Sequence, residues 1–382
     1  MKVLLLPSWY PDEKNFLNGV FFKEQAEALV KEGIDVVVLS INIVSLSEFG
    51  KDKITNKIKK TTENGVTVYR YYTYNYFPRM TELYLRYYSH LINKLMGNII
   101  SEHPDIKLVH IHSAIDAGIA YSKSKVSLPY VITEHSSKYQ RNILNETQKK
   151  YLKDVFEGAK KVIAVGSGLR TAISKYININ DIDIIPNLVS LTKESTEIDD
   201  KKEKFRFFSL GVLTKTKGMD LLIEAFNNNK EALKNCEVYI GGDGLEYSNL
   251  KEQIESLNLQ DSIKLLGKLS RKEVEYHMNN CDAFALASRF ETFGIVFLEA
   301  MIYGKPVIGT KTGGPDTFIN DSNGLLVNVE NTKQLGDALV TMYKDREKYN
   351  SQKIFEYCNS NFNEKVICNK IISIYREIAN DV

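Results

Sequence analysis

Short apolar segments alternate with segments of helical length along this chain, and this alternation limits the folds it can adopt. It is typical of parallel sheets whose strands are joined by crossover helices. In the first half we expect a helix over residues 19–31 and strands over 2–6, 35–40, 66–72, 108–111, 130–133, 162–165 and 182–185. In the second half we expect helices over 220–227, 245–256 and 272–279, and strands over 206–211, 237–241, 263–266, 283–287 and 306–310. The sequence therefore predicts two α/β halves.

A charged segment separates the two halves. Residues 191–204 read LTKESTEIDDKKEK and contain almost no apolar side chains, which indicates a linker or an exposed loop. We predict an N-terminal Rossmann-like domain over 1–188, a linker over 189–204, a C-terminal Rossmann-like domain over 205–355, and a C-terminal helix over 356–382 that returns to the N-terminal domain. Two doubly wound domains would face each other across a cleft at the carboxyl ends of their strands.

The composition is that of an ordinary folded protein. Hydrophobic residues make up 43% and charged residues 26% of 382 residues, and the net charge of +2 favours no nucleic-acid partner. The four cysteines lack the spacing of a zinc site and read as reduced thiols. No apolar run approaches the ~20 residues that cross a bilayer, and the first apolar run is too short for a signal peptide. We therefore expect a cytoplasmic protein.

Residues 288–308, SRFETFGIVFLEAMIYGKPVI, carry the most informative local pattern. A helix is expected over residues 293–303. Gly304 fits a left-handed C-terminal cap, and Pro306 cannot continue the helix, so the next strand follows directly.

Two carboxylates flank the start of this helix. Glu291 precedes it and Glu299 lies within it. The free N–H groups of Gly294, Ile295 and Val296, with the positive end of the helix dipole, would hold an anion such as a diphosphate. A phosphate with hydroxyl acceptors on both sides describes a site for a nucleotide sugar. Two glutamates on a helix also fit a solvated face, but the apolar neighbours indicate a buried helix whose acids need partners.

A second pattern follows the first strand of the second half. Lys217 lies just before an expected helix, between Gly211 and Gly218. Glycine lets the backbone approach a phosphate, and lysine supplies a point charge. A surface loop with a solvated lysine fits the same residues.

These patterns combine with Gly313-Gly314 and with Asn323-Gly324 in a fixed order along the chain. In that order they resemble the family 4 glycosyltransferases of GT-B fold over nearly the whole chain, more strongly in the C-terminal half. The resemblance implies a retaining enzyme that needs no metal or cofactor. It would move a sugar from a nucleotide-diphosphate donor, with UDP-sugar favoured over GDP-sugar, to a hydroxyl of a glycan or lipid-linked saccharide. The implied setting is bacterial capsule, O-antigen or exopolysaccharide synthesis, with peripheral contact at the cytoplasmic face of the inner membrane.

The resemblance also implies roles for individual residues. Glu291 would contact the donor sugar, Glu299 the ribose and Lys217 the diphosphate. The implied catalytic residues are Glu291, His135 and Lys217. Donor contacts are implied for Gly19, Gly211, Lys217, Gly267, Lys268, Gly294, Ile295, Val296 and Glu299, with Gly267 and Lys268 near the base. Acceptor contacts are assigned to Trp9, Tyr10 and His112.

Three histidines end neighbouring strands. His135 is expected near the transferred sugar, as the resemblance implies. His110 and His112 are expected to point to opposite sides, one into the core and one toward the cleft, with a structural role for His110 and either role open for His112. No cysteine or carboxylate lies at ligand spacing from them, so we predict no metal site.

Two departures from the family pattern leave alternatives open. Val212 stands where most members have an arginine, and we hypothesise that Lys215 compensates for it. A single glycine, Gly19, stands where many relatives have two. A catalytically weak nucleotide-sugar-binding protein and a GT-B-like nucleotide-sugar epimerase therefore remain alternatives.

A segment rich in tyrosine and arginine covers residues 69–88. It fits a membrane interface, a carbohydrate-stacking surface, or a strand and a helix that pack tyrosines into the core. The lysine-rich residues 51–60 are expected to form a solvated loop.

Overall fold

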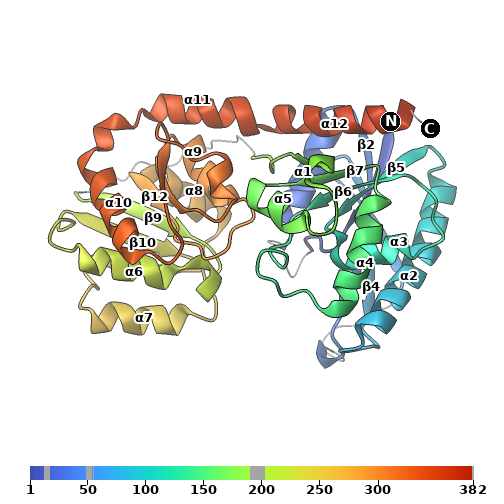
Figure 1. Cartoon of the computed structure of the whole chain (residues 1–382), viewed down its shortest axis with the longest axis horizontal. Helices are drawn as coiled ribbons and strands as arrows, with labels where there is room; N and C mark the ends of the chain where they lie inside the picture. The colour runs from blue at the N-terminus through green and yellow to red at the C-terminus, as the bar shows by residue number, and fades with distance from the viewer. Residues whose placement is uncertain (13–17, 49–53, 55, 190–202, 381–382) are drawn as a thin grey trace. The chain divides into compact units, whose positions relative to one another are not determined.

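A computed structural model of the chain describes residues 1–12, 18–48, 54, 56–189 and 203–380 (Figure 1). The chain divides into two compact units. Unit 1 contains Met1–Val165, Leu169–Leu188 and Glu364–Val382, and unit 2 contains Gly166–Gly168 and Val189–Asn363. The predicted linker over 189–204 lies almost entirely outside the described residues.

Unit 1 is built on an eight-stranded sheet in the order β3-β4-β2-β1-β5-β6-β7-β8. The pairs are parallel except β3–β4, which is antiparallel. The strands are β1 (Lys2–Pro7), β2 (Asp35–Val44), β3 (Ile58–Glu63), β4 (Val66–Tyr74), β5 (Ile106–His112), β6 (Tyr130–Glu134), β7 (Lys161–Ala164) and β8 (Ile182–Ile184). Seven of these strands were predicted. Strand β3 was missed because its sequence, IKKTTE, is polar and mostly exposed, as suits an edge strand.

Helices cover both faces of this sheet. The core on one face joins alternate side chains of β1, such as Val3 and Leu5, to Ile371 and Tyr375 of the C-terminal helix. The helix after β1 begins at Val20, directly after Gly19, and contacts this C-terminal helix. The helices of unit 1 are α1 (Val20–Lys31), α2 (Thr81–Glu102), α3 (Ile119–Ser122), α4 (Glu146–Glu157), α5 (Ser167–Ile173) and α12 (Glu364–Asn380), with short helical turns η1 (Leu46–Glu48), η2 (Ala114–Gly118) and η3 (Ile179–Asp181).

The C-terminal helix begins later than predicted. Helix α11 (Ser351–Phe362) belongs to unit 2, and α12 (Glu364–Asn380) belongs to unit 1. Between them, Asn363 has an extended backbone, with φ −65° and ψ 161°. One non-helical residue therefore ends one helix and starts the next, and the predicted start at residue 356 falls inside α11 instead.

Half of the eight tyrosines in residues 69–88 belong to the core. Tyr69, Tyr71, Tyr74 and Tyr88 are buried, whereas Tyr76 is 50% exposed. The packing interpretation therefore holds for most of β4 and for Tyr88 of α2, and not for the exposed Tyr76. Among the described residues, no helix is both long enough and apolar enough to cross a membrane.

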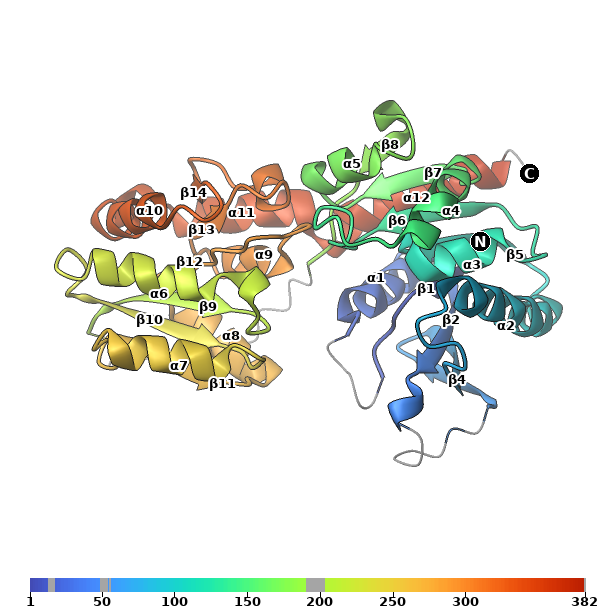
Figure 2. The same ribbon diagram turned by 60° about the horizontal axis from the view of Figure 1, so that its bottom comes forward.

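Unit 2 contains a six-stranded sheet in the order β11-β10-β9-β12-β13-β14, with all pairs parallel (Figure 2). The strands are β9 (Phe205–Leu210), β10 (Cys236–Gly241), β11 (Ile263–Gly267), β12 (Ala283–Ala285), β13 (Val307–Thr310) and β14 (Gly324–Val327). The first five were predicted, and β14 was not. The order reverses between β9 and β12, and open α/β sheets bind ligands at the carboxyl ends of the strands at such a point.

The helices of unit 2 form two groups (Figures 1 and 2). α6 contacts both α7 and α10 on one side of the sheet, and α9 contacts both α8 and α11 on the other. Their bounds are α6 (Met219–Asn228), α7 (Tyr247–Ser256), α8 (Arg271–Asn280), α9 (Ile295–Ile302), α10 (Thr332–Lys344) and α11 (Ser351–Phe362). Short helical turns are η4 (Lys215–Lys217), η5 (Pro315–Thr317) and η6 (Arg346–Lys348). The three helices predicted between residues 220 and 279 differ from these bounds by at most two residues.

Candidate functional site

Two loops of unit 2 leave the sheet where its strand order reverses. The loop after β9 carries Lys217 in the short turn η4, and the loop after β12 carries Glu291. Gly218, with φ 65°, follows Lys217, and a Cβ atom there would lie 2.0 Å from the carbonyl oxygen of Ala287. Glycine is therefore needed for the first loop to run against the second.

An ion pair joins the two loops. The ammonium of Lys217 donates to Oε2 of Glu291 over 2.6 Å, and the two side chains are 24% and 12% exposed. The stem of Lys217 lies over Gly211, since a Cβ atom on Gly211 would contact that side chain at 3.4–3.6 Å. Lys217 and Glu291, both predicted to contact the donor, are 74 positions apart in the chain and thus meet at one place in the structure.

Helix α9 begins directly beyond Glu291. Its first residue is Ile295, because Gly294 takes a left-handed conformation with φ 90° and ψ 58°. The expected helix start at residue 293 is therefore two residues too early. No side chain caps this helix start in the part of the chain that the structure describes. The first backbone N–H groups of a helix have no partner within it and can bind an anion.

The backbone of Gly294 is closely surrounded by side chains, and a prediction about stability follows from this packing. A Cβ atom there would approach Phe297 to 2.7 Å and Cγ of Glu291 to 3.1 Å. Gly267 also has positive φ, 72°, but a Cβ atom there would meet nothing within 4 Å. Both changes to alanine carry the left-handed backbone cost, and only Gly294→Ala adds overpacking of about 1–3 kcal/mol. Denaturant unfolding should show this difference. Equal destabilisation of the two variants would contradict it.

Glu299 faces a partner that the sequence analysis did not single out. Nη1 of Arg271, the first residue of α8, donates to Oε1 of Glu299 over 2.7 Å, and Nε of Arg271 donates to Glu275 over 3.0 Å. Gly267 ends β11, with Lys268 directly after it, two strands from β9 at the same sheet edge. The predicted donor residues of unit 2 thus occupy one sheet edge, where Lys217 pairs directly with Glu291.

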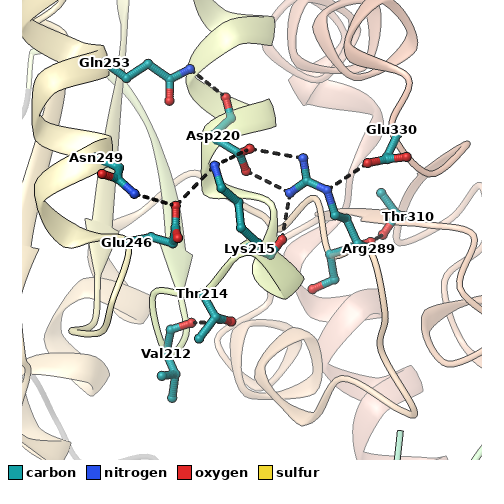
Figure 3. Close-up of polar contacts among 11 residues, drawn as sticks. Val212, Thr214, Lys215, Asp220, Glu246, Asn249, Gln253, Arg289, Thr310 and Glu330 are labelled. Carbon is teal, nitrogen blue, oxygen red and sulfur yellow. Dashed lines mark hydrogen bonds and ion pairs between the residues drawn. The ribbon is translucent and has the colours of Figure 1, made fainter. Parts of the chain in front are cut away.

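Val212 and Lys215 lie in the loop after β9, shortly before Lys217 (Figure 3). Val212 is 62% exposed. The ammonium of Lys215 is 3.4 Å from Asp220 and 3.2 Å from Glu246. Its charge is therefore already matched by two carboxylates, and these pairs would have to break for Lys215 to replace the missing arginine.

His110, His112 and His135 of unit 1 form one buried cluster. The rings of His110 and His112 stack with centroids 4.2 Å apart, and Nδ1 of His112 lies 3.2 Å from Nε2 of His135. Nδ1 of His110 is 2.5 Å from the hydroxyl of Tyr375, and its Nε2 is 2.7 Å from that of Thr133. The prediction that His110 and His112 point to opposite sides is wrong, because residues two apart in a strand share one face.

The burial of the three histidines predicts how the stability of the fold depends on pH. Burial lowers the pKa of His110 and of His135 to about 3, and lowers the pKa of His112 well below 6.5. An unfolded histidine binds a proton near pH 6.5, so protons favour the unfolded state below that pH. Stability should be fully present above pH 6.5 and decline as the pH falls toward 3. Ring NMR signals of the three residues should not titrate between pH 8 and 5.5. An inflection near pH 6.5 would contradict this.

The loop after β1 packs into unit 1. Tyr10 is 3% exposed, and the guanidinium of Arg70 lies 5.6 Å from its ring centre. Trp9 packs against Phe22 with ring centres 5.3 Å apart, and a Cβ atom on Gly19 would lie 2.8 Å from Trp9. Tyr10 is thus a core residue, as His112 is, and the acceptor contacts of both stay predictions.

Glu134 is another residue that the sequence analysis missed. It is fully buried and accepts hydrogen bonds from the backbone N–H groups of Ala114, His135 and Ser136 and from the hydroxyl of Tyr139. Burial raises the pKa of Glu134. Its position directly before His135 was the only signal in the sequence. In the described part of the chain, no three His, Cys, Asp or Glu side chains are arranged to hold a metal ion.

Two family profiles match the chain, and each covers most of one unit. A family profile described as "Glycosyltransferase Family 4" matches residues 19–193, and one described as "Glycosyl transferases group 1" matches residues 192–355. An uncharacterized glycosyltransferase of Methanocaldococcus jannaschii is 28% identical over 91% of this chain and 90% of its own length. An N-acetylgalactosamine-N,N'-diacetylbacillosaminyl-diphospho-undecaprenol 4-alpha-N-acetylgalactosaminyltransferase of Campylobacter jejuni is 31% identical over 56% of this chain and 59% of its own length.

Solved structures with the same architecture cover the whole chain. Sucrose-phosphate synthase of Thermosynechococcus elongatus superposes with a TM-score of 0.80 at 16% identity, covering all of both chains. The Anabaena protein HepE in complex with UDP superposes with a TM-score of 0.73 at 19% identity, covering 99% of this chain and 100% of its own. These neighbours confirm the predicted GT-B fold with two Rossmann-like α/β domains. Because the two profiles together span residues 19–355, the chain belongs to the family 4 glycosyltransferases.

Proposed function

We propose that this glycosyltransferase moves a sugar from a nucleoside-diphosphate donor to a hydroxyl of a glycan or lipid-linked saccharide. In the proposal it retains the anomeric configuration and needs no metal or cofactor, as the family resemblance implies. The observation that carries it is the pairing of Lys217 with Glu291 in front of the start of helix α9, where the strand order of unit 2 reverses. A cation, free N–H groups and a carboxylate converge there.

The three groups suit three parts of the donor. The diphosphate would bind the ammonium of Lys217 and the N–H groups at residues 294–296, which also meet the charge that develops on the leaving group. Once a phosphate takes the ammonium, the carboxylate of Glu291 is released to accept hydrogen bonds from sugar hydroxyls. In the proposed route the bond from the anomeric carbon to the phosphate oxygen breaks, and the acceptor oxygen bonds to the same face. The acceptor proton passes to the departing phosphate.

The remaining predicted roles belong to this proposal. Glu299 would hold the ribose, in which case Arg271 would exchange its 2.7 Å partner or share it. Gly267 and Lys268 would lie near the base. His135 is predicted to orient the sugar, and Trp9, Tyr10 and His112 stay acceptor predictions.

UDP-sugar is the favoured donor in this proposal. The Anabaena neighbour binds UDP, and the name of the Campylobacter relative specifies a diphospho-undecaprenol-linked acceptor. Contact with the cytoplasmic face of a membrane would suit such an acceptor. The exposed part of the tyrosine-rich segment, with Tyr76, Met80 and Leu83, is the surface we predict for that contact. Capsule, O-antigen or exopolysaccharide synthesis is the setting that these substrates favour.

A panel of nucleotide sugars tests the proposal. UDP-, GDP- and ADP-sugars are added to the purified protein, and the midpoint of thermal unfolding is recorded, because a ligand stabilises by RT ln(1 + [L]/Kd). We expect a shift with UDP-sugars above all. The stabilising donor is then incubated with and without acceptor glycans, and products are analysed. No stabilisation by any nucleotide sugar would contradict the proposal.

The second step separates the two alternatives. Isomerisation of the donor sugar without an acceptor would identify an epimerase. Donor binding without transfer to any acceptor would identify a binding protein, the alternative that exposed Val212 in place of an arginine favours. Sugar transfer would exclude the binding protein.

A further inference from the structure

Arg289 lies two residues before Glu291, and its side chain is 19% exposed (Figure 3). Such a guanidinium needs several partners, because a buried charge without them is costly. The proposed chemistry gives Arg289 no contact with the donor. Its partners therefore have to explain why a charged side chain lies here.

The guanidinium connects three segments of unit 2. Nη1 and Nη2 of Arg289 donate to Oδ1 and Oδ2 of Asp220 over 2.9 and 3.1 Å, a bidentate pair (Figure 3). Nη1 also donates to the carbonyl oxygen of Lys215 over 2.7 Å, and Nε donates to Oε1 of Glu330 over 2.9 Å. Asp220 lies in the first turn of helix α6, directly after the loop of Lys217.

The backbone of Arg289 holds the same turn. Its N–H group donates to the carbonyl oxygen of Thr216 over 2.8 Å. Lys215 and Thr216 are the two residues directly before Lys217, so two hydrogen bonds from Arg289 fix the turn η4 that presents Lys217. On its other side, the carbonyl oxygen of Ser288 accepts from the hydroxyl of Thr310 on β13 over 2.5 Å. The loop segment that carries Arg289 is thus attached to the sheet.

The pair is suited to fixed geometry. A planar guanidinium binding both oxygens of a carboxylate holds orientation as well as charge, and lysine cannot reproduce it. Burial opposes ionisation of Asp220, but the hydrogen bonds and charge of Arg289 outweigh burial, so the pKa of Asp220 is lowered. Glu330, with a side chain 64% exposed, is the outermost partner and contributes least to this geometry.

We propose that Arg289 and Asp220 are positioning residues that hold the turn of Lys217 in place beside Glu291. Neither touches the donor, and both act through the backbone of residues 215–217. The inference rests on the proposed function, because Lys217 is taken to bind the diphosphate. A misplacement of about 1 Å in such a group can cost on the order of 100-fold.

A double-mutant cycle tests this inference. UDP, or whichever nucleoside diphosphate stabilises the wild type, is titrated calorimetrically into Arg289→Ala, Lys217→Ala and the double variant. We expect Arg289→Ala to weaken binding about 10-fold or more. In the Lys217→Ala background the same change should cost less than about threefold, because residues that act through one another are not additive. A merely structural role would instead give additive losses.

Conservative variants guard against loss of folding. Asp220→Asn and Arg289→Lys keep size or charge, and both should weaken binding while circular dichroism stays that of the wild type. Glu246→Gln is the matched control, since Glu246 pairs with Lys215 but not with Arg289, and it should bind as the wild type does.

The outcomes separate the inference from the proposed function. Wild-type affinity in all Arg289 and Asp220 variants, or additivity in the cycle, would overturn the inference alone, provided that Lys217→Ala weakens binding. Unchanged affinity in Lys217→Ala would overturn the diphosphate role of Lys217, and the inference with it.

Discussion

Glu291→Ala is expected to lower the rate of sugar transfer by about 100-fold or more. Glu291 is 12% exposed and lies 2.6 Å from the ammonium of Lys217, so its carboxylate is held at one place in front of helix α9. In the proposed chemistry this carboxylate positions the sugar for attack. Its loss would leave the donor bound through the diphosphate but with its anomeric carbon poorly oriented.

The measurement is release of the nucleoside diphosphate in the presence of an acceptor. We expect kcat to fall, and the affinity for the free diphosphate to change much less, because Glu291 contacts the sugar. Glu255→Ala is the matched control, since Glu255 is 52% exposed on α7, away from both loops. Near-normal turnover by a folded Glu291→Ala variant would remove Glu291 from the mechanism.

Lys217→Ala is expected to cost a similar factor, about 100-fold or more, for a different reason. The ammonium neutralises the diphosphate both in the bound donor and in the leaving group. Donor affinity should therefore fall together with kcat. Val212 supplies no second positive charge, and Lys215 is paired with Asp220 and Glu246, so little remains to compensate.

Two variants sharpen this second test. Lys217→Arg keeps the positive charge and should recover part of the donor affinity. Lys251→Ala removes a lysine that is 64% exposed on α7 and should behave as the wild type. Equal donor affinity in Lys217→Ala and Lys251→Ala would show that the diphosphate binds elsewhere.

Local sequence signals predicted the strands that carry the site. Segments such as residues 206–211 are short, apolar and bounded by glycine or charge, so their ends and the loops after them could be placed. Strand β3 was missed because it is stabilised by pairing with β4 at a sheet edge and not by its own apolar content. The exact start of α9 depended on the left-handed conformation of Gly294, which a glycine in the sequence allows but does not require.

Pairings across long distances in the chain could not be predicted. Arg289 and Asp220 are 69 positions apart, and Arg271 and Glu299 are 28 apart. Each pair forms only because the strand order brings separate loops or helices together, and charged residues near a glycine-rich loop fit solvated positions equally well. The histidine cluster was within reach of the sequence, since the shared face of His110 and His112 follows from their spacing of two.

A crystal structure with UDP bound, or with the nucleoside diphosphate that the panel selects, would test the central claim most directly. We predict diphosphate oxygens within hydrogen-bonding distance of Nζ of Lys217 and of the backbone nitrogens of residues 294–296. The carboxylate of Glu291 should then be free of the 2.6 Å contact with Lys217. A diphosphate bound elsewhere, with the Lys217–Glu291 pair intact, would contradict the assignment.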